Sequence, residues 1–283
     1  MPGLGYFITG ANGQLGTALR KKYPKARYAD IAELDITDMA SIESYDWTGV
    51  DILINAAAYT NVDGAESPEG KKTAKAVNAE AVANLAKLCQ SKQITLVHIS
   101  TDYVFDGSND NHSETEPTSP LSVYGSSKAE GDKFAGGTPK HYILRTSWVI
   151  GEGKNFVRIM MSLAEKNISP TVVHDQVGRL TFTKTLVDAI DHLLTTEAAF
   201  GTYNVSNDGE PASWADITRE IFKELGREDL TVTDVTTEKY YAGKTGIAPR
   251  PLKSTLNLAK IKAAGFKPTD WKDELKDYLK GQK

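Results

Sequence analysis

The chain has 283 residues, of which 40% are hydrophobic, and its 33 basic and 37 acidic residues give a formal net charge of −4. This composition excludes a wholly disordered chain, and the lack of a long apolar run or a Lys/Arg-rich block argues against a membrane span and against nucleic acid as the main partner. The single cysteine, Cys89, excludes an internal disulfide and, with no visible signal peptide, predicts a cytoplasmic protein.

Apolar runs alternate with helical patterns through the first half of the chain. The apolar runs occupy residues 6–9, 51–55, 95–100 and 142–145. A helix is predicted after the first run, and a longer one over residues 70–90, where apolar residues recur with a period near 3.6. Continuous apolar strands that alternate with helices are typical of a parallel sheet covered on both faces, so the sequence predicts an α/β fold.

The second half is less regular. Helical patterns cover residues 156–166, 184–194 and 212–225, whereas residues 106–120 and 239–255 show little periodicity and are predicted to be loops. The charged run from Lys260 to Lys283 predicts a solvated helix face. A compositional boundary falls near Gly151, but no linker is long enough to separate two independent domains.

Three glycines follow the first apolar run at a spacing of three. Gly10, Gly13 and Gly16 stand between the predicted strand and the predicted helix. In that context glycines allow a tight turn, a close approach of the backbone to a pyrophosphate, and a helix N-terminus that attracts phosphate. The pattern therefore predicts dinucleotide binding, with the alternative that the glycines merely end a strand.

Acidic residues follow the next short apolar run. Asp30 lies where an acidic side chain commonly meets the adenosine ribose, although it could also be a solvated loop residue. Asp35 and Ile36 are candidates for the adenine edge. An acid at the ribose favours NAD over NADP, and the nearby Arg27 leaves both cofactors open.

Tyr124 and Lys128 are four residues apart and would share one face of a helix. An ammonium group near a phenol favours the phenolate, so we expect the pKa of Tyr124 to fall towards the working pH. Thr101, at the end of a predicted strand, would place a hydroxyl beside it. A second Tyr-x-x-x-Lys, at Tyr240 and Lys244, has no strand end to pair with, and we do not expect it to be catalytic.

These features occur in a familiar order. The motifs are Gly10 to Gly16, Asn55-Ala56-Ala57-Ala58-Tyr59, Ser100-Thr101-Asp102-Tyr103-Val104-Phe105, Tyr124 to Lys128, Arg145-Thr146-Ser147-Trp148-Val149, Lys154-Asn155-Phe156, His174-Asp175-Gln176 and Arg250-Pro251. Together they resemble the extended short-chain dehydrogenase/reductase superfamily and, within it, the family of dTDP-4-dehydrorhamnose reductases. The resemblance runs from residue 5 to about residue 270, nearly the whole chain.

The resemblance implies a fold and a reaction. The fold is a Rossmann-type, doubly wound parallel sheet over residues 1–150 with a smaller substrate lobe over residues 151–283, and the segment near 180–206 returns to the sheet. The reaction is the NADPH- or NADH-dependent reduction of dTDP-6-deoxy-L-lyxo-4-hexulose to dTDP-L-rhamnose, the last step of its synthesis. A dTDP-sugar is then the partner molecule, and a homodimer is possible.

The resemblance also implies roles for individual residues. Tyr124 would give a proton to the 4-keto oxygen, Lys128 would hold the nicotinamide ribose, and Thr101 would hydrogen-bond the keto oxygen. Implied cofactor contacts are Gly10, Gly13, Gln14, Leu15, Gly16, Asp30, Asp35, Ile36, Ala56, Ala57 and Ala58. Implied substrate contacts are Asp102 and Trp148 at the sugar, and Asn155 and Arg250 at the diphosphate.

Some features leave alternatives open. Many relatives have Pro-Thr where this chain has Arg179-Leu180, so the conformation of this loop and the details of substrate binding stay open. An epimerase or a 4,6-dehydratase on the same fold is an alternative, although dehydratases have Glu where this chain has Tyr103. A non-catalytic subunit, like that of methionine adenosyltransferase, is another. The glutamates that hold a metal in some relatives have no match, so we predict no metal.

Other conspicuous side chains have simpler interpretations. His98 lies within an apolar strand and Cys89 on an apolar helix face, so packing explains both. Trp214 is likewise predicted to be a core residue. The remaining histidines do not have metal-ligand spacing.

Overall fold

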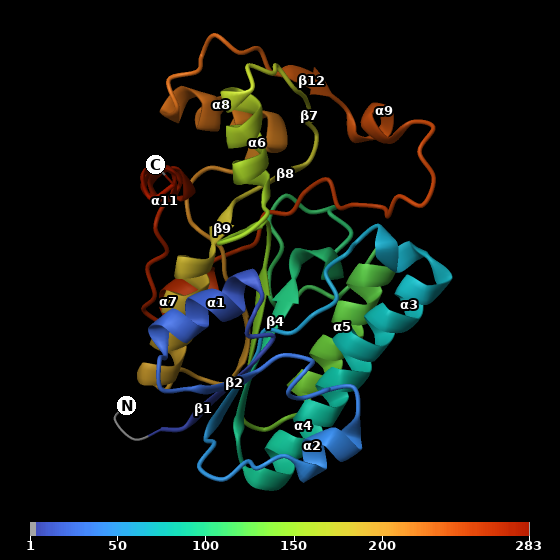
Figure 1. Ribbon diagram of the computed structural model, residues 1–283, viewed down its shortest axis with the longest axis vertical. Helices are drawn as coiled ribbons and strands as arrows, with labels where there is room; N and C mark the ends of the chain where they lie inside the picture. Colours follow the sequence, from blue (N-terminus) through green and yellow to red (C-terminus); the bar gives the residue numbers. More distant parts are fainter. Residues whose placement is uncertain (1–3, 283) are drawn as a thin grey trace.

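The protein is built around a six-stranded sheet (Figure 1), which we describe from a computed structural model that covers residues 4–282. The strands run in the order β2-β1-β3-β4-β5-β10, and all neighbours are parallel. Their bounds are Tyr6–Thr9 (β1), Arg27–Ala29 (β2), Ile52–Asn55 (β3), Thr95–Thr101 (β4), His141–Thr146 (β5) and Gly201–Asn204 (β10). The predicted doubly wound α/β fold is confirmed, although the sequence analysis had not identified β10 as a strand.

The strand order reverses at β1. From this strand the chain crosses to β2 on one side, and then continues with β3 on the other side of β1. Helices that follow neighbouring strands on opposite sides of such a point diverge and leave a crevice outside the carboxyl ends of the strands. The glycine turn after β1 and the alanines after β3 both lie at this crevice.

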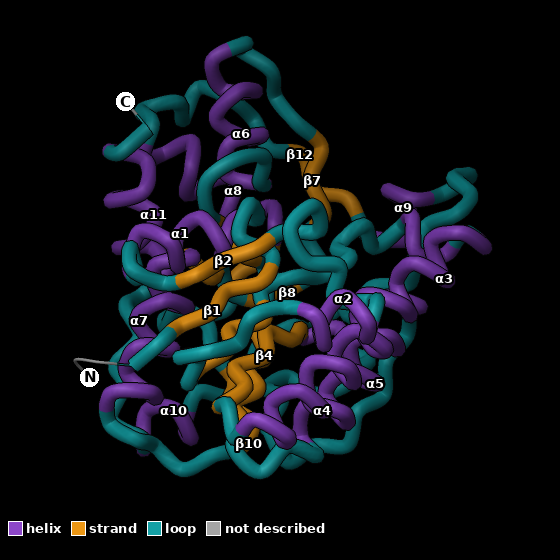
Figure 2. Tube along the Cα trace, turned by 60° about the horizontal axis from the view of Figure 1, so that its bottom comes forward, coloured by secondary structure: helices purple, strands orange, loops and turns teal. Residues whose placement is uncertain are grey.

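Helices cover both faces of the sheet (Figures 1 and 2). α1 (Gln14–Lys22), α7 (Thr183–Thr195) and α10 (Ala259–Ala263) cover one face, whereas α2 (Met39–Ser44), α4 (Ala81–Lys92) and α5 (Val123–Gly136) cover the other. Because strand side chains alternate between faces, Ile8 packs into the first cluster and Phe7 into the second. Both side chains are completely buried, as expected for a strand between two layers of helices.

The helix predicted over residues 70–90 is interrupted. α3 (Pro68–Lys75) and α4 are joined by a π-helical turn, η2 (Ala76–Glu80). Within this turn the buried Asn78 side chain accepts a hydrogen bond from the Tyr59 backbone N–H and donates to the Tyr59 carbonyl and the Ser127 hydroxyl. The extra residue of the π turn therefore lets one amide connect the loop after β3 with α5.

A third hydrophobic cluster lies beyond the carboxyl ends of the strands. It is formed by α6 (Phe156–Glu165), α8 (Trp214–Glu224) and α11 (Trp271–Lys280), with three short strand pairs beside them (Figure 1). The pairs are β6 (Val149–Ile150) with β9 (Thr181–Phe182), β7 (Thr171–Val173) with β12 (Thr233–Val235), and β8 (Val177–Gly178) with β11 (Ala212–Ser213). α7 and β10 lie between these elements in sequence but belong to the sheet instead, because α7 packs against α1 and β10 pairs with β5.

Two predictions about the C-terminal segments need correction. The stretch predicted as a loop from residue 239 begins inside the short helix α9 (Thr237–Tyr241). The charged C-terminal run is more than a solvated face, because Trp271, Leu275 and Leu279 of α11 are buried on its other side. No helix among residues 4–282 is long and apolar enough to cross a membrane.

Candidate active site

Two adjoining cavities open at the carboxyl ends of β1, β3 and β4. Their volumes are about 350 Å³ and about 440 Å³, and Gly13, Ala56 and Ala58 line both. We call the first the nucleotide cavity and the second the reaction cavity. Each is within the size range of small-molecule sites, and together they form a continuous crevice at the point where the strand order reverses.

The glycine turn forms one wall of the crevice. Gly10 has a φ of +66°, and a Cβ there would lie 2.5 Å from the Ala57 nitrogen. A Cβ on Gly16 would lie 2.1 Å from the Gly10 carbonyl oxygen, so the first turn of α1 packs closely only without a side chain there. Gly13 is the N-cap of α1 and no side chain caps this helix end. The first N–H groups of α1 are thus available to an anionic ligand.

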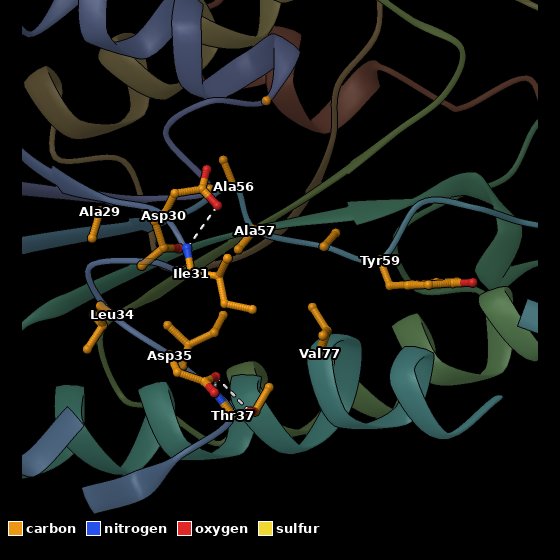
Figure 3. A pocket seen from close by; sticks show the side chains of 15 residues that line it. Ala29, Asp30, Ile31, Leu34, Asp35, Thr37, Ala56, Ala57, Tyr59 and Val77 are labelled. Carbon is orange, nitrogen blue, oxygen red and sulfur yellow. Dashed lines mark hydrogen bonds between the residues drawn. The ribbon is translucent and has the colours of Figure 1, made fainter. Parts of the chain in front are cut away.

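Acidic side chains line the nucleotide cavity (Figure 3). The Asp30 carboxylate, directly after β2, accepts hydrogen bonds from the backbone N–H groups of Asn12, at 3.1 Å, and Ile31, at 2.9 Å. The Asp35 carboxylate accepts hydrogen bonds from the backbone N–H and the hydroxyl of Thr37. The side chains that line this cavity include both aspartates and Ile36 but, within residues 4–282, no lysine or arginine. The hydroxyl groups of a ligand therefore suit this cavity better than a phosphate group, because carboxylates accept hydrogen bonds from hydroxyls and repel a negative charge.

The reaction cavity brings together residues from four separate parts of the chain. Thr101 ends β4, Asp102 begins the short helix η3 (Asp102–Val104), Tyr124 and Lys128 lie on α5, and Trp148 follows β5. Gln14 and Leu15 of α1 line the same cavity on the side of the glycine turn. All the implied sugar-contacting and proton-transferring residues therefore line one cavity.

The environment of Tyr124 contradicts one expectation. Burial of its phenol raises the pKa to about 12, and a hydrogen bond with Thr101 only partly opposes this rise. The Lys128 Nζ donates a hydrogen bond to the Ile99 carbonyl at 2.6 Å. Tyr124 is therefore a protonated phenol at neutral pH, the form that can give a proton away.

Lys128 is a buried lysine, with only 2% of its surface exposed. Burial lowers its pKa from 10.5 to about 8, and the negative charge of Asp132, one helical turn further along α5, opposes this effect. The Asp132 carboxylate accepts a hydrogen bond from the Arg145 Nε at 3.0 Å. Below pH 8 Lys128 therefore holds a buried positive charge in the cavity wall that Tyr124 also lines.

Asp102 is a buried carboxyl group in the wall of the reaction cavity. One carboxylate oxygen accepts the Thr101 hydroxyl at 3.1 Å, whereas the other, Oδ2, is buried without a hydrogen-bond partner. Burial raises the pKa of this carboxyl to about 6, and the nearby hydroxyl groups of Ser254 and Thr101 oppose this rise. Because buried polar atoms in proteins are normally paired, Oδ2 is an acceptor that remains to be satisfied.

The structure does not bring Asn155 and Arg250 to the cavity wall. Asn155 is the N-cap of α6, and its amide donates to the Gly151 carbonyl at 2.8 Å and to the Tyr278 hydroxyl at 3.0 Å. Arg250 forms an ion pair with Asp63 at 2.8 Å. Its positive charge opposes the rise that burial causes in the pKa of Tyr103, a residue of the cavity wall.

Several residues that line the cavity were not predicted from the sequence. For the reaction cavity they are Thr60, Val62, Ile99, Ser100, Tyr103, Thr146, Val149 and Leu186. Tyr103 adjoins the Thr-Asp pair and could have been found from that position. Leu186 comes from α7, far along the chain, and no local signal marks it.

His98 and Tyr240, which the sequence analysis did not expect to be catalytic, lie outside the site. His98 is completely buried, its Nδ1 is 3.2 Å from the Asn55 amide nitrogen, and burial lowers its pKa well below the usual value. Tyr240 is 40% exposed, and Lys244 lies over its ring rather than in a cavity. The packing interpretation of His98 is confirmed, and neither residue lines the crevice.

Comparisons with known proteins agree with this geometry. A family model described as RmlD substrate binding domain matches residues 6–283. The chain is 39% identical to a dTDP-4-dehydrorhamnose reductase of Aggregatibacter actinomycetemcomitans, over 95% of this chain and 96% of that protein. It is 38% identical to the spore coat polysaccharide biosynthesis protein SpsK of Bacillus subtilis, over 96% and 95%. A crystal structure of a dTDP-4-dehydrorhamnose reductase from Bacillus anthracis in complex with NADP matches with a TM-score of 0.90 at 34% identity, covering 98% of each chain.

Proposed function

The chain belongs to the RmlD substrate binding domain family, and from this premise we infer that it is an NAD(P)H-dependent oxidoreductase that reduces the 4-keto group of dTDP-6-deoxy-L-lyxo-4-hexulose to give dTDP-L-rhamnose. The observation that carries this inference is the reaction cavity. Thr101, Tyr124 and Lys128 line it together, directly beside the wall formed by the glycine turn. A proton donor and a dinucleotide site are thus adjacent.

The residues of the nucleotide cavity fit a nicotinamide dinucleotide. The uncapped N-terminus of α1 and the close packing around Gly10 and Gly16 support a pyrophosphate site at the turn. Asp30 and Asp35 supply hydrogen-bond acceptors for the adenosine side, and Ala56, Ala57 and Ala58 leave room for a flat ring system. When bound, this cofactor supplies the hydride.

The chain's own residues supply the proton and its environment. Tyr124 holds a proton on its phenol at neutral pH and would give it to the oxygen at C4. The Lys128 ammonium group would stabilise the phenolate that remains, because a positive charge near a phenolate favours the charged form. Thr101, within hydrogen-bonding range of Tyr124, would orient the same oxygen.

The sugar side of the cavity has its own polar and apolar groups. The unpaired Oδ2 of Asp102 would accept a sugar hydroxyl, and the Trp148 ring would provide an apolar wall. We propose that the cluster of α6, α8 and α11 packs behind the nucleotide-sugar side of the site without touching the sugar, while the sheet carries the cofactor. Arg250 would meet the diphosphate only after release from Asp63, and its fork of donors suits that group.

Spectrophotometry of cofactor oxidation tests the function. Purified protein is mixed with enzymatically prepared dTDP-6-deoxy-L-lyxo-4-hexulose and either NADPH or NADH, and the product is identified by chromatography. We expect formation of dTDP-L-rhamnose, and a fall in kcat of about 10²- to 10⁴-fold in Tyr124→Phe, since this is the usual contribution of general acid catalysis.

Tyr240→Phe is the matched control, because it alters the other tyrosine of a Tyr-x-x-x-Lys pair and lies outside the cavity. It should retain the wild-type rate. No turnover by folded wild-type protein that still binds the cofactor would contradict the proposed function.

A further inference from the structure

Trp148 has an unusual backbone conformation beside the reaction cavity. Its φ is +46°, a left-handed value that a bulky residue adopts only when its surroundings enforce it. Its indole ring is stacked on that of Trp214, with 3.7 Å between ring centroids and 19° between ring planes. The backbone strain and the stacked ring are two observations on the same residue, and both indicate that the orientation of this ring matters.

Trp214 is itself held from several sides. It is the first residue of α8, where Ser213 and Asp216 form a capping box that fixes the start of the helix. Its Nε1 donates a hydrogen bond to the Gln176 Oε1 at 3.2 Å, and the ring of Phe156 packs against it with centroids 4.4 Å apart. The Trp214 ring is therefore a fixed surface, anchored independently of Trp148.

The other contacts of Trp148 leave no space for rotation towards β8. A Cβ placed on Gly178 would lie 3.1 Å from Cζ2 of the Trp148 ring, so this strand passes as close as a glycine permits. Gln176, on the same segment, also donates to the Thr237 hydroxyl at 3.0 Å. Trp148 thus contacts both the Trp214 ring and the β8 backbone, and it contributes to the cavity wall, whereas Trp214 does not line the cavity.

We propose that Trp214 is a positioning residue for the sugar-nucleotide substrate: it fixes the Trp148 ring as a flat apolar wall against which the hexose ring packs. The proposal rests on the proposed function, since it concerns the same substrate. The C–H groups and the methyl group of a 6-deoxyhexose offer an apolar face that an indole ring accommodates. Trp214 acts only through Trp148, so its removal should affect the sugar and leave the cofactor untouched.

Substitution of Trp214 tests this role. Trp214→Leu removes the aromatic partner, and Trp214→Phe keeps a smaller stacking ring in the same place. We expect KM for the dTDP-sugar to rise about 3- to 10-fold in Trp214→Leu, the range given by the usual strength of an aromatic pair, with kcat and KM for the reduced cofactor within about twofold of wild type. Trp214→Phe should recover most of the loss.

Trp271→Phe is the matched control. Trp271 is a buried tryptophan of the same hydrophobic cluster, it donates its Nε1–H to the Glu210 carbonyl, and it is not stacked on Trp148. This variant should lower the melting temperature as Trp214→Leu does, yet leave KM for the dTDP-sugar unchanged. The comparison separates a loss of stability from a loss of ring position.

Calorimetric titration gives a second measurement that does not depend on turnover. Trp214→Leu should weaken the binding of dTDP-L-rhamnose about 3- to 10-fold and leave the binding of dTDP alone unchanged, because only the sugar meets Trp148. Equal weakening of both ligands, or equal effects of Trp271→Phe and Trp214→Leu on KM, would overturn the positioning role. Failure of the wild type to bind or reduce the dTDP-sugar would instead overturn the proposed function.

Discussion

Replacing Lys128 by methionine should make the protein more stable while removing its activity. Lys128 is buried, and its pKa is about 8 instead of 10.5. At 1.36 kcal/mol per pKa unit, this difference means that the buried charge costs about 3 kcal/mol of folding free energy at pH 7. Methionine fills a similar volume without the charge. Because the Ile99 carbonyl then loses a hydrogen bond, at a cost of about 1 kcal/mol, we expect a net gain of about 2 kcal/mol.

The gain should depend on pH in a defined direction. Below pH 8 the lysine is charged in both the folded and unfolded states, so the full cost of burial is present. Between pH 8 and pH 10.5 the unfolded chain binds a proton that the folded protein does not, and wild-type stability therefore rises with pH in this window. The advantage of Lys128→Met should be greatest near pH 7 and about 2 kcal/mol smaller at about pH 9.5.

Urea unfolding and thermal unfolding of the cofactor-free proteins measure this difference. At pH 7 the melting temperature of Lys128→Met should exceed that of wild type by about 4–8 °C, and its kcat should fall by about 100-fold or more. Lys133→Met, which removes an exposed charge from the same helix, should stay within about 0.5 kcal/mol of wild type. A Lys128→Met protein that unfolds more easily than wild type at pH 7 would refute the reasoning, since the buried charge would then be fully compensated.

Two further predictions concern the cofactor and the implied diphosphate site. No lysine or arginine of the described chain lines the nucleotide cavity with Asp30 and Asp35, so wild type should have a higher kcat/KM with NADH than with NADPH. Asp30→Asn should reduce that ratio by about tenfold, and an unchanged ratio would show that Asp30 does not select the cofactor. Asn155→Ala should lower the free energy of unfolding by about 1–2 kcal/mol through loss of the α6 cap, as measured by urea unfolding, and leave KM for the dTDP-sugar within about twofold of wild type. A large rise in KM without a change in stability would restore Asn155 to the substrate site.

Local patterns in the sequence were sufficient for much of the architecture. The apolar runs at β1, β3, β4 and β5 were identified because parallel strands are buried on both faces and so have few polar residues. The short strand β10 was missed, because its four residues, Gly201 to Asn204, have no periodicity of their own and join the sheet only through β5. The π turn before α4 was missed for a similar reason, since its Asn78 bonds to Tyr59 and Ser127 rather than to its own helix.

The sequence by itself determined which residues could perform the chemistry. Glycines at a spacing of three after a strand, and Tyr124 and Lys128 on one helical face, are local patterns that a single segment encodes. Only the tertiary structure decided how these groups behave. The raised pKa of Tyr124 comes from burial by other segments, Asn155 is used as a helix cap, and Trp148, in the turn after β5, is stacked on a residue of α8. Desolvation and packing depend on elements far apart in the chain, and the spacing within one segment carries no information about them.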